Sequence, residues 1–464
     1  MNGKNTLSIK LIATRSLISI SLLSTLGWSA YIVAQDSEAT ALLKARTAEF
    51  DQDIIQVSEN VFTAVGYAVS PVSMIVGPEG LVIIDTGIDI NAAQQIREDF
   101  RAISDKPVKA IIFTHGHGDH TTGAPAFMDS EDVQVWARHD YGHEGGFLQE
   151  AGLTIQNQRG GRQGGFLLGP EQRINNGVAK AYWPSRGGEI FNTAEAVEPN
   201  NFLESDRLTL NIAGLELDIV AASGETNDQL YVWYAAEEVV FSGDNFYKSW
   251  PNLYAIRGTG YRDIREWALS LRKILEENPA ALVGGHTRPI IGRMQVRETL
   301  TNFRDAIQFV FDKTIEGMNQ GMTPNQLVQY VQLPEKYQEL DYLKPYYGNP
   351  EWAVRSIFNG YLGWFDGNAT SLFSLSDKDE AQRIADLAGG VATLRTQAIV
   401  AQERGDNQWA AQLCDYLLAL DPEDNIALLT KADALEALAN ELLTATGRNY
   451  YLTSANELRN RAND

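Results

Sequence analysis

Three histidines and an aspartate crowd one short segment of this chain. The segment reads Thr114-His115-Gly116-His117-Gly118-Asp119-His120, in a protein that has only six histidines. Imidazole nitrogens and a carboxylate oxygen in this combination are the donors that zinc sites use. A lone histidine is usually a structural residue, but three within six positions do not fit a core-packing pattern. We therefore interpret the segment as metal-binding.

The spacing of these donors predicts two metal ions. Adjacent side chains in a loop diverge, so Asp119 and His120 can bind a metal that His115 and His117 do not reach. Bimetallic hydrolases hold two ions about 3.5 to 4 Å apart and use them to activate water and to stabilise the charge of a leaving oxygen. The segment therefore indicates metal-dependent hydrolysis.

Predicted strands must position these donors. The apolar run Val108 to Phe113 precedes the histidine segment and is typical of a buried strand. Glu225, Asp244 and His286 also follow apolar runs, where a rigid strand would hold each side chain in place. Taken singly, each of the three is typical of a solvated loop. Together with the histidine segment, we interpret them as further metal ligands.

The two parts of the chain differ in their predicted secondary structure. Over residues 35–320, short β-branched runs alternate with helical patterns, and hairpins are predicted around Ala213-Gly214 and Ala236-Glu237, which favours a sheet-rich α/β sandwich. Residues 158–188 are rich in Gly and Arg and predict a long functional loop.

The sequence pattern of residues 321–464 predicts helices and no strands. Trp409 to Leu420 and Ile426 to Leu442 resemble a tetratricopeptide-type pair. Too few such units are present for a free-standing solenoid, so their apolar faces should pack on the first domain or on a second copy. The alternative is a plain helical bundle without a partner.

Charge and cysteine content narrow the class of partner. The formal net charge is −22. Nucleic acid and anionic lipid surfaces are therefore unsuitable partners, and an anionic substrate would need a local positive site made by metal and arginine. The single cysteine, Cys414, excludes an intramolecular disulfide.

The sequence pattern of the N-terminal segment predicts that the protein is exported. Residues 1–34 carry three basic residues and no acidic one, and Ser16 to Ala34 is largely apolar. This pattern resembles a secretory signal peptide, and its length also permits an uncleaved membrane anchor. We expect a periplasmic or secreted protein, with membrane attachment only through such an anchor.

The H-x-H-x-D-H motif at positions 115 to 120 resembles the metallo-β-lactamase superfamily. Gly224-Glu225-Thr226 stands where that superfamily usually has Gly-His-Thr, and in this respect the chain is similar to the alkyl sulfatase branch. Asn252 to Gly258, Tyr361 to Asn368 and Asn449 to Arg459 are also similar to that branch. The resemblance implies an αββα sandwich followed by an all-α, tetratricopeptide-like dimerisation domain, and therefore a homodimer.

The resemblance also implies the ligands of two zinc ions per subunit, although other divalent transition metals would fit. It implies His115, His117 and Glu225 on one ion, Asp119, His120 and His286 on the other, and Asp244 between them. The candidate catalytic residues are Asp119, Arg257 and Asn245, of which Arg257 would hold the sulfate and Asn245 is a second candidate for that task.

Two features depart from the branch. Its bridging carboxylate is usually a Glu in an Ala-Glu-Asn setting, whereas this chain has Gly243-Asp244-Asn245. The chain also ends soon after Arg459, where longer members continue into a sterol-carrier-like domain, so a preference for long alkyl chains does not follow.

The predicted function is hydrolysis of an alkyl sulfate ester to an alcohol and inorganic sulfate by metal-activated water. Two alternatives stay open. One is a dizinc hydrolase of another ester, namely a lactone, thioester or phosphodiester. The other is a non-catalytic metal-binding scaffold of the cell envelope.

Overall fold

The computed structural model describes residues 36–180 and 196–463, so the predicted export segment, residues 1–34, lies outside these ranges. Within them, no helix is both long enough and apolar enough to cross a membrane.

Seven strands form the first sheet in sequential order. They are β1 (Asp53–Gln56), β2 (Val61–Val65), β3 (Val72–Val76), β4 (Leu81–Ile84), β5 (Val108–Ile112), β6 (Gln134–Arg138) and β7 (Asn201–Leu203). Pairing is antiparallel from β1 to β4 and parallel from β4 to β7. The loops that follow β4 and β5 therefore lie at the same edge of the sheet.

Six strands form the second sheet, in the order β13-β12-β11-β10-β9-β8. They are β8 (Arg207–Ile212), β9 (Leu215–Ala221), β10 (Leu230–Tyr234), β11 (Val239–Phe241), β12 (Ala281–Val283) and β13 (Ile290–Ile291). The predicted hairpins are confirmed: Ile212 pairs with Leu215, and Tyr234 pairs with Val239. Ala213 and Gly214 have φ angles of 57° and 74°, as a tight turn between twisted strands requires.

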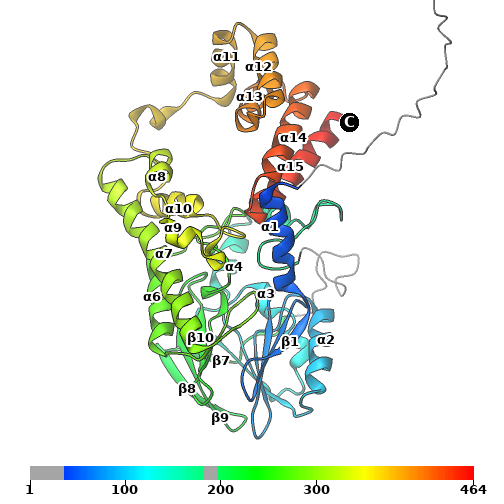
Figure 1. Cartoon of the computed structure of the whole chain (residues 1–464), viewed down its shortest axis with the longest axis vertical. Coiled ribbons are helices and arrows are strands. Elements are labelled where there is room, and N and C mark those ends of the chain that lie inside the picture. Colours follow the sequence, from blue (N-terminus) through cyan, green and yellow to red (C-terminus); the bar gives the residue numbers. More distant parts are fainter. Residues whose placement is uncertain (1–35, 181–195, 464) are drawn as a thin grey trace, which may run out of the picture. The chain divides into compact units, whose positions relative to one another are not determined.

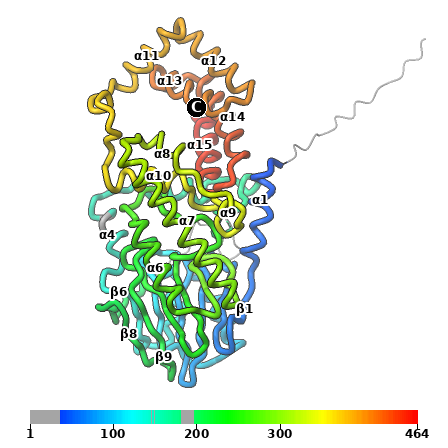
Figure 2. The backbone as a smooth tube through the Cα atoms, turned by 60° about the vertical axis from the view of Figure 1, so that its left-hand side comes forward, coloured from blue at the N-terminus to red at the C-terminus, as the bar shows by residue number. Residues whose placement is uncertain are grey.

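The two sheets pack face to face, with helices on both outer faces, as Figures 1 and 2 show. The inner layer joins apolar residues of both sheets, including Ile75, Ile112, Ile219 and Val232. Helix α2 (Ile90–Arg101) packs on the outer face of the first sheet, and α6 (Ile264–Glu276) and α7 (Arg293–Asn319) pack on that of the second. The αββα sandwich expected from the resemblance is therefore present.

The C-terminal part is helical, as predicted. Its helices are α8 (Pro324–Tyr330), α9 (Glu335–Gln338), α10 (Pro350–Leu362), α11 (Asp377–Leu387), α12 (Val391–Glu403), α13 (Asn407–Leu420), α14 (Asn425–Asn440) and α15 (Ala445–Asn463). Consecutive helices from α12 to α15 pack on one another around an apolar core that includes Leu413, Cys414 and Leu428.

The predicted division at residue 320 marks a change of secondary structure but no break in packing. One apolar core joins Trp267 and Val310, before residue 320, to Tyr337 and Val354, after it. The first helices of the C-terminal part are therefore packed on the sandwich.

The long loop predicted at residues 158–188 is partly wrong. Helix α5 (Ile155–Gln163) occupies its beginning, although this helix contains two adjacent glycines. Arg162 of α5 forms two hydrogen bonds with the carboxylate of Glu457 on α15, at 3.0 and 2.9 Å. Docking on α15 thus outweighs the weak helix propensity of glycine. Residues 181–188 lie outside the described ranges.

Candidate active site

Loops at the ends of four strands bring together all seven predicted ligands. The histidine segment follows β5, Glu225 follows β9, Asp244 follows β11, and His286 follows β12. Their donor atoms form three mutually close groups: His115, His120 and Asp244; Asp119, His120 and His286; and His117, Glu225 and Asp244. Residues up to 171 positions apart along the chain therefore meet at one edge of the sandwich.

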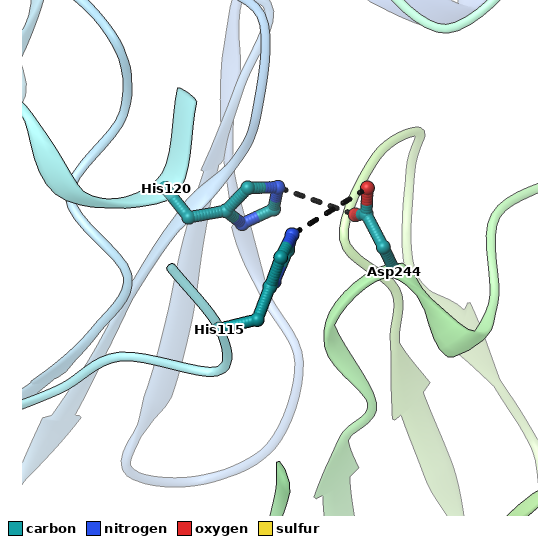
Figure 3. Close-up of side chains that lie close together, drawn as sticks. All are labelled: His115, His120 and Asp244. Atoms are coloured by element: carbon teal, nitrogen blue, oxygen red, sulfur yellow. Dashed lines mark ion pairs between the residues drawn. The ribbon is translucent and has the colours of Figure 1, made fainter. Parts of the chain in front are cut away.

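Asp244 lies between the two sets of ligands. Its Oδ1 is 3.2 Å from His120 Nε2, and its Oδ2 is 3.2 Å from His286 Nε2 and 4.0 Å from His115 Nε2. Figure 3 shows His115 and His120 directed at this carboxylate from the same side. This central place is the one expected of a bridging carboxylate.

The remaining ligands fall into two sets around Asp244. Asp119 Oδ2 is 3.7 Å from His286 Nε2 and 3.8 Å from His120 Nε2. His117 Nδ1 is 4.0 Å from Glu225 Oε1 and 3.0 Å from His115 Nε2. Asp119 thus lies beside His120 and His286, and His117 lies beside His115 and Glu225.

The orphaned atoms of this centre fit metal ions. His120 Nε2 and Asp244 Oδ1 are buried and form no hydrogen bond, although they face each other. Buried polar atoms rarely lack a partner, and a site of imidazole and carboxylate donors supplies one when it binds a divalent transition metal. The donor set therefore suits divalent metal binding.

Asp85 orients ligands of both sets, and sequence reasoning missed it. Its Oδ2 accepts hydrogen bonds from His120 Nδ1 and from the hydroxyl of Thr114, both at 2.8 Å. Because that hydroxyl proton is used, Thr114 Oγ1 can only accept from His115 Nδ1, at 3.1 Å. Both imidazoles thus turn Nε2 to the centre. Asp85 directly follows the apolar run of β4, the same signal that identified the other donors.

Two further contacts fix the ligand loops. His286 Nδ1 is 3.0 Å from the carbonyl oxygen of Val69, which leaves Nε2 facing Asp244. Asp228 Oδ2 accepts from the backbone N–H groups of Gly116 and Gly142, at 3.0 and 2.9 Å. The carboxylate of Asp228 thereby holds the histidine segment against the loop that follows β6.

Buried groups of opposite charge shift one another's pKa values in this centre. Burial lowers the pKa values of His115 and His117 well below their usual range, and neighbouring histidines act in the same direction. Burial also opposes the protonation of His120 and His286, but the carboxylate of Asp244 leads the effects that outweigh it and raise both pKa values. Burial likewise opposes ionisation of Asp244, yet His286 and His120 hold its pKa well below its usual range. The Asp244 carboxylate thus favours positive charge beside it.

A cavity of about 570 Å³ opens on this centre. Its walls include His117, Asp119, Glu225, Asp244 and His286, together with Arg257, Phe166, Tyr347 and Thr446. Tyr347 and Thr446 come from the C-terminal helical part, so that part completes the wall of the cavity. Arg257 therefore lies in the wall of the same cavity as these ligand residues.

Asn245 has a different position from the one predicted. It is fully buried, does not border the cavity, and donates through Nδ2 to the carbonyl oxygen of Ala222 at 2.8 Å. A Cβ atom at Gly224 would lie only 1.7 Å from Asn245 Oδ1. Asn245 therefore supports the loop that carries Glu225 and is not placed to hold a substrate.

Two histidines stay outside the centre. His139 Nδ1 is 3.3 Å from the carbonyl oxygen of Leu203, and His143 is exposed at the start of α4 (His143–Glu150). Neither belongs to a group of donors that could hold a metal in the described part of the chain.

Two known families match this chain. Residues 66–286 match the family described as the metallo-beta-lactamase superfamily, and residues 323–461 match the one described as alkyl sulfatase dimerisation. The first match contains six of the predicted ligands and ends on the seventh, His286.

Named relatives match most of the chain. A linear primary-alkylsulfatase of Pseudomonas sp. is 34% identical over 83% of this chain and 73% of its own length. An (R)-specific secondary-alkylsulfatase of Pseudomonas sp. is 28% identical over 88% of this chain, which spans only 62% of that relative. The solved structure of the stereoselective inverting sec-alkylsulfatase Pisa1 from Pseudomonas sp. superposes with a TM-score of 0.83 and 26% identity, over 92% of this chain and 69% of that one.

Proposed function

Since this chain belongs to the alkyl sulfatase branch of the metallo-beta-lactamase superfamily, we propose that it is a hydrolase that cleaves alkyl sulfate esters to an alcohol and inorganic sulfate. The observation that carries the proposal is the shared cavity of Arg257 and the ligand centre. A planar guanidinium group can bind two oxygens of a sulfate at once.

The proposed cofactors are two Zn²⁺ ions per subunit, or two other divalent transition metal ions. His115, His117 and Glu225 would hold one ion, Asp119, His120 and His286 the other, with Asp244 between them, which the distances between their donor atoms support. When bound, such ions activate water at neutral pH and stabilise negative charge on ester oxygens. The chain's own contribution is to fix the donors through Asp85, Val69 and Asp228.

Arg257 is the proposed anion-holding residue. Its backbone N–H donates to Gln163 Oε1 at 3.1 Å, which ties the Arg257 loop to helix α5. The attraction between this guanidinium group and the ester becomes stronger as negative charge develops on the departing sulfate. Asp119, which lies beside His120 and His286, borders the same cavity.

We also propose a homodimer formed through the C-terminal helical part. Large apolar side chains are exposed there, with Phe373 at 95%, Leu387 at 85% and Trp364 at 71% of their surfaces. All three lie within the segment that matches the dimerisation family. Exposed apolar residues in such number favour a protein partner, and a second copy fits the family.

Export remains a proposal based on residues 1–34, which carry basic residues followed by an apolar stretch. N-terminal sequencing of protein from the periplasmic and membrane fractions tests it. A processed N-terminus in the soluble periplasm is expected, and an intact N-terminus in the membrane fraction would indicate the anchor instead.

The function is tested by inorganic sulfate release from octyl and dodecyl sulfate by the zinc-loaded protein, with a phosphodiester, a thioester and a lactone run alongside. Sulfate release should fall by about 10²- to 10³-fold in Arg257→Ala, as for loss of one oxyanion donor. Arg272→Ala, on the exposed side of α6, serves as the control and should keep full activity. Turnover of another ester without sulfate release would overturn the substrate, and turnover of none would favour the scaffold.

A further inference from the structure

A second arginine, Arg262, lies against the ligand centre beside Glu225. It precedes α6, and only 3% of its surface is exposed. Its Nη1 donates to Glu225 Oε1 at 2.7 Å and to the carbonyl oxygen of Asn252 at 2.6 Å. Because both side chains of the ion pair are almost fully buried, solvent does not screen their interaction. Arg262 was not predicted from the sequence, because it does not follow an apolar run as the predicted ligands do.

The charge of Arg262 is directed at Glu225. Its Nε and Nη2 atoms are buried and form no hydrogen bond. In the described ranges, Glu225 is the only carboxylate within ion-pair distance of the guanidinium group. The geometry therefore directs one positive charge at one carboxylate of the ligand centre.

The carboxylate of Glu225 is held on two sides. Arg262 binds Oε1, the same oxygen that lies 4.0 Å from His117 Nδ1, and the hydroxyl of Tyr247 donates to Oε2 at 3.5 Å. The side chain is therefore fixed with an oxygen directed at the neighbouring imidazole. A ligand that is already oriented loses less freedom when a metal binds.

A charge count explains why such a partner is needed. In the usual superfamily pattern the third ligand of this set is a neutral histidine, whereas Glu225 adds one negative charge once metal binding ionises it. One guanidinium charge offsets it, so the set His115, His117 and Glu225 with Arg262 has the net charge of a three-histidine site. A buried carboxylate left without a partner would be strongly destabilising.

We propose that Arg262 is a positioning residue for the first metal site: it orients Glu225 and offsets its charge, which allows a glutamate to serve where a histidine usually does. This inference rests on the proposed two-metal centre. A purely structural ion pair is the competing explanation, and loss of stability alone does not separate the two, because breaking any buried pair destabilises the fold.

Metal affinity separates them. We expect Arg262→Gln to weaken binding of one of the two ions by about 10- to 100-fold, as for other residues that orient metal ligands. Chelator competition with Zn²⁺ and the metal content after dialysis measure this without any substrate. Arg257→Gln is the matched control, since it should keep both ions. Unchanged affinity in Arg262→Gln would overturn the inference.

A double variant tests the charge argument. In Glu225→His the third ligand is neutral, so adding Arg262→Gln should cost less than threefold in affinity. An equal loss in both backgrounds would show that Arg262 acts only on the fold and would overturn the proposal. Should Arg262→Gln fail to fold, Arg262→Lys keeps the charge but replaces the guanidinium nitrogen that reaches both Glu225 and the carbonyl oxygen of Asn252, and about tenfold weaker binding is expected, with unchanged binding as the contrary result. A wild-type chain that binds no metal would overturn the proposed function itself.

Discussion

The ligand edge of the sandwich and the C-terminal helices differ in which kind of side chain they bury and which they expose. At the ligand edge, charged side chains are buried and face one another, as with His120, His286 and Asp244. In the helical part, large apolar side chains such as Phe373 and Trp364 face solvent. Polar groups that are buried together need a counter-charge, while apolar groups that are exposed need a cover.

A single chain provides the partners of its buried charged groups but leaves some apolar side chains of the helical part uncovered. The ligand centre already has its orienting partners within the chain, including Asp85 and Arg262. The exposed apolar residues have no comparable cover in the described part of the chain. Metal should therefore act mainly on the sandwich, and a second copy mainly on the helices.

The largest expected effect is that of pH on the metal-free protein. The pKa values of His120 and His286 are raised in the fold, so the folded state keeps protons that the unfolded state has lost above pH about 6.5. Their contribution to stability is complete below that pH and is lost as pH rises through the folded pKa values, by up to about 1.4 kcal/mol per group and pH unit.

Burial raises the pKa of Glu225 to about 7, against the effect of Arg262, so this group acts in the same direction between its unfolded value and pH 7. Thermal unfolding of chelator-treated protein at pH 6.5, 7.5 and 8.5 should show a falling midpoint. The zinc-loaded protein should show a smaller decrease, since metal replaces the protons. A metal-free midpoint that rises with pH would contradict the charge arrangement.

Asp85→Asn should have the next largest effect. Its carboxylate accepts from Thr114 and His120, and loss of such support typically lowers metal affinity or turnover by about 10- to 100-fold. Asp129→Asn is the control, because Asp129 pairs with buried Arg97 far from the ligands and should affect stability alone. Equal metal affinity in both variants would show that Asp85 does not orient the site.

Dimer formation should respond less strongly. Phe373→Ser removes an apolar side chain that is 95% exposed, and burying such a side chain is worth about 1.5 to 3 kcal/mol. The dissociation constant of the dimer should rise about tenfold or more, as measured by analytical ultracentrifugation. Met294→Ser, on α7 and 82% exposed, should leave the association unchanged. Equal weakening by both variants would place the contact elsewhere.

The smallest effect is expected where the two regions meet. Arg162 and Glu457 join α5 to α15 across this boundary, but both are partly exposed, so Arg162→Ala should cost about 1 kcal/mol or less in unfolding free energy. Arg461→Ala removes a looser, more exposed pair and should cost close to nothing. Urea denaturation measures both. A loss above about 3 kcal/mol would mean that the boundary is far more rigid than its contacts suggest.

Much of the site could be predicted because its ligands obey a local rule. Each of the seven follows an apolar run, and β5, β9, β11 and β12 end where those runs end. The same rule applied to β4 would have identified Asp85. It could not identify Arg262, which follows no strand, nor could it show that Asn245 turns away from the cavity to bind the carbonyl oxygen of Ala222.

By itself, the sequence determined which donors the protein has, the strands that carry them and the helical character of everything after residue 320, because hydrophobic periodicity and donor chemistry are local properties. Only the tertiary structure decided which groups face each other. Glycine-containing α5 is a helix because α15 holds it, and Thr446 borders the same cavity as His117, far away along the chain. Contacts across hundreds of residues depend on how sheets and helices pack, and no local pattern encodes them.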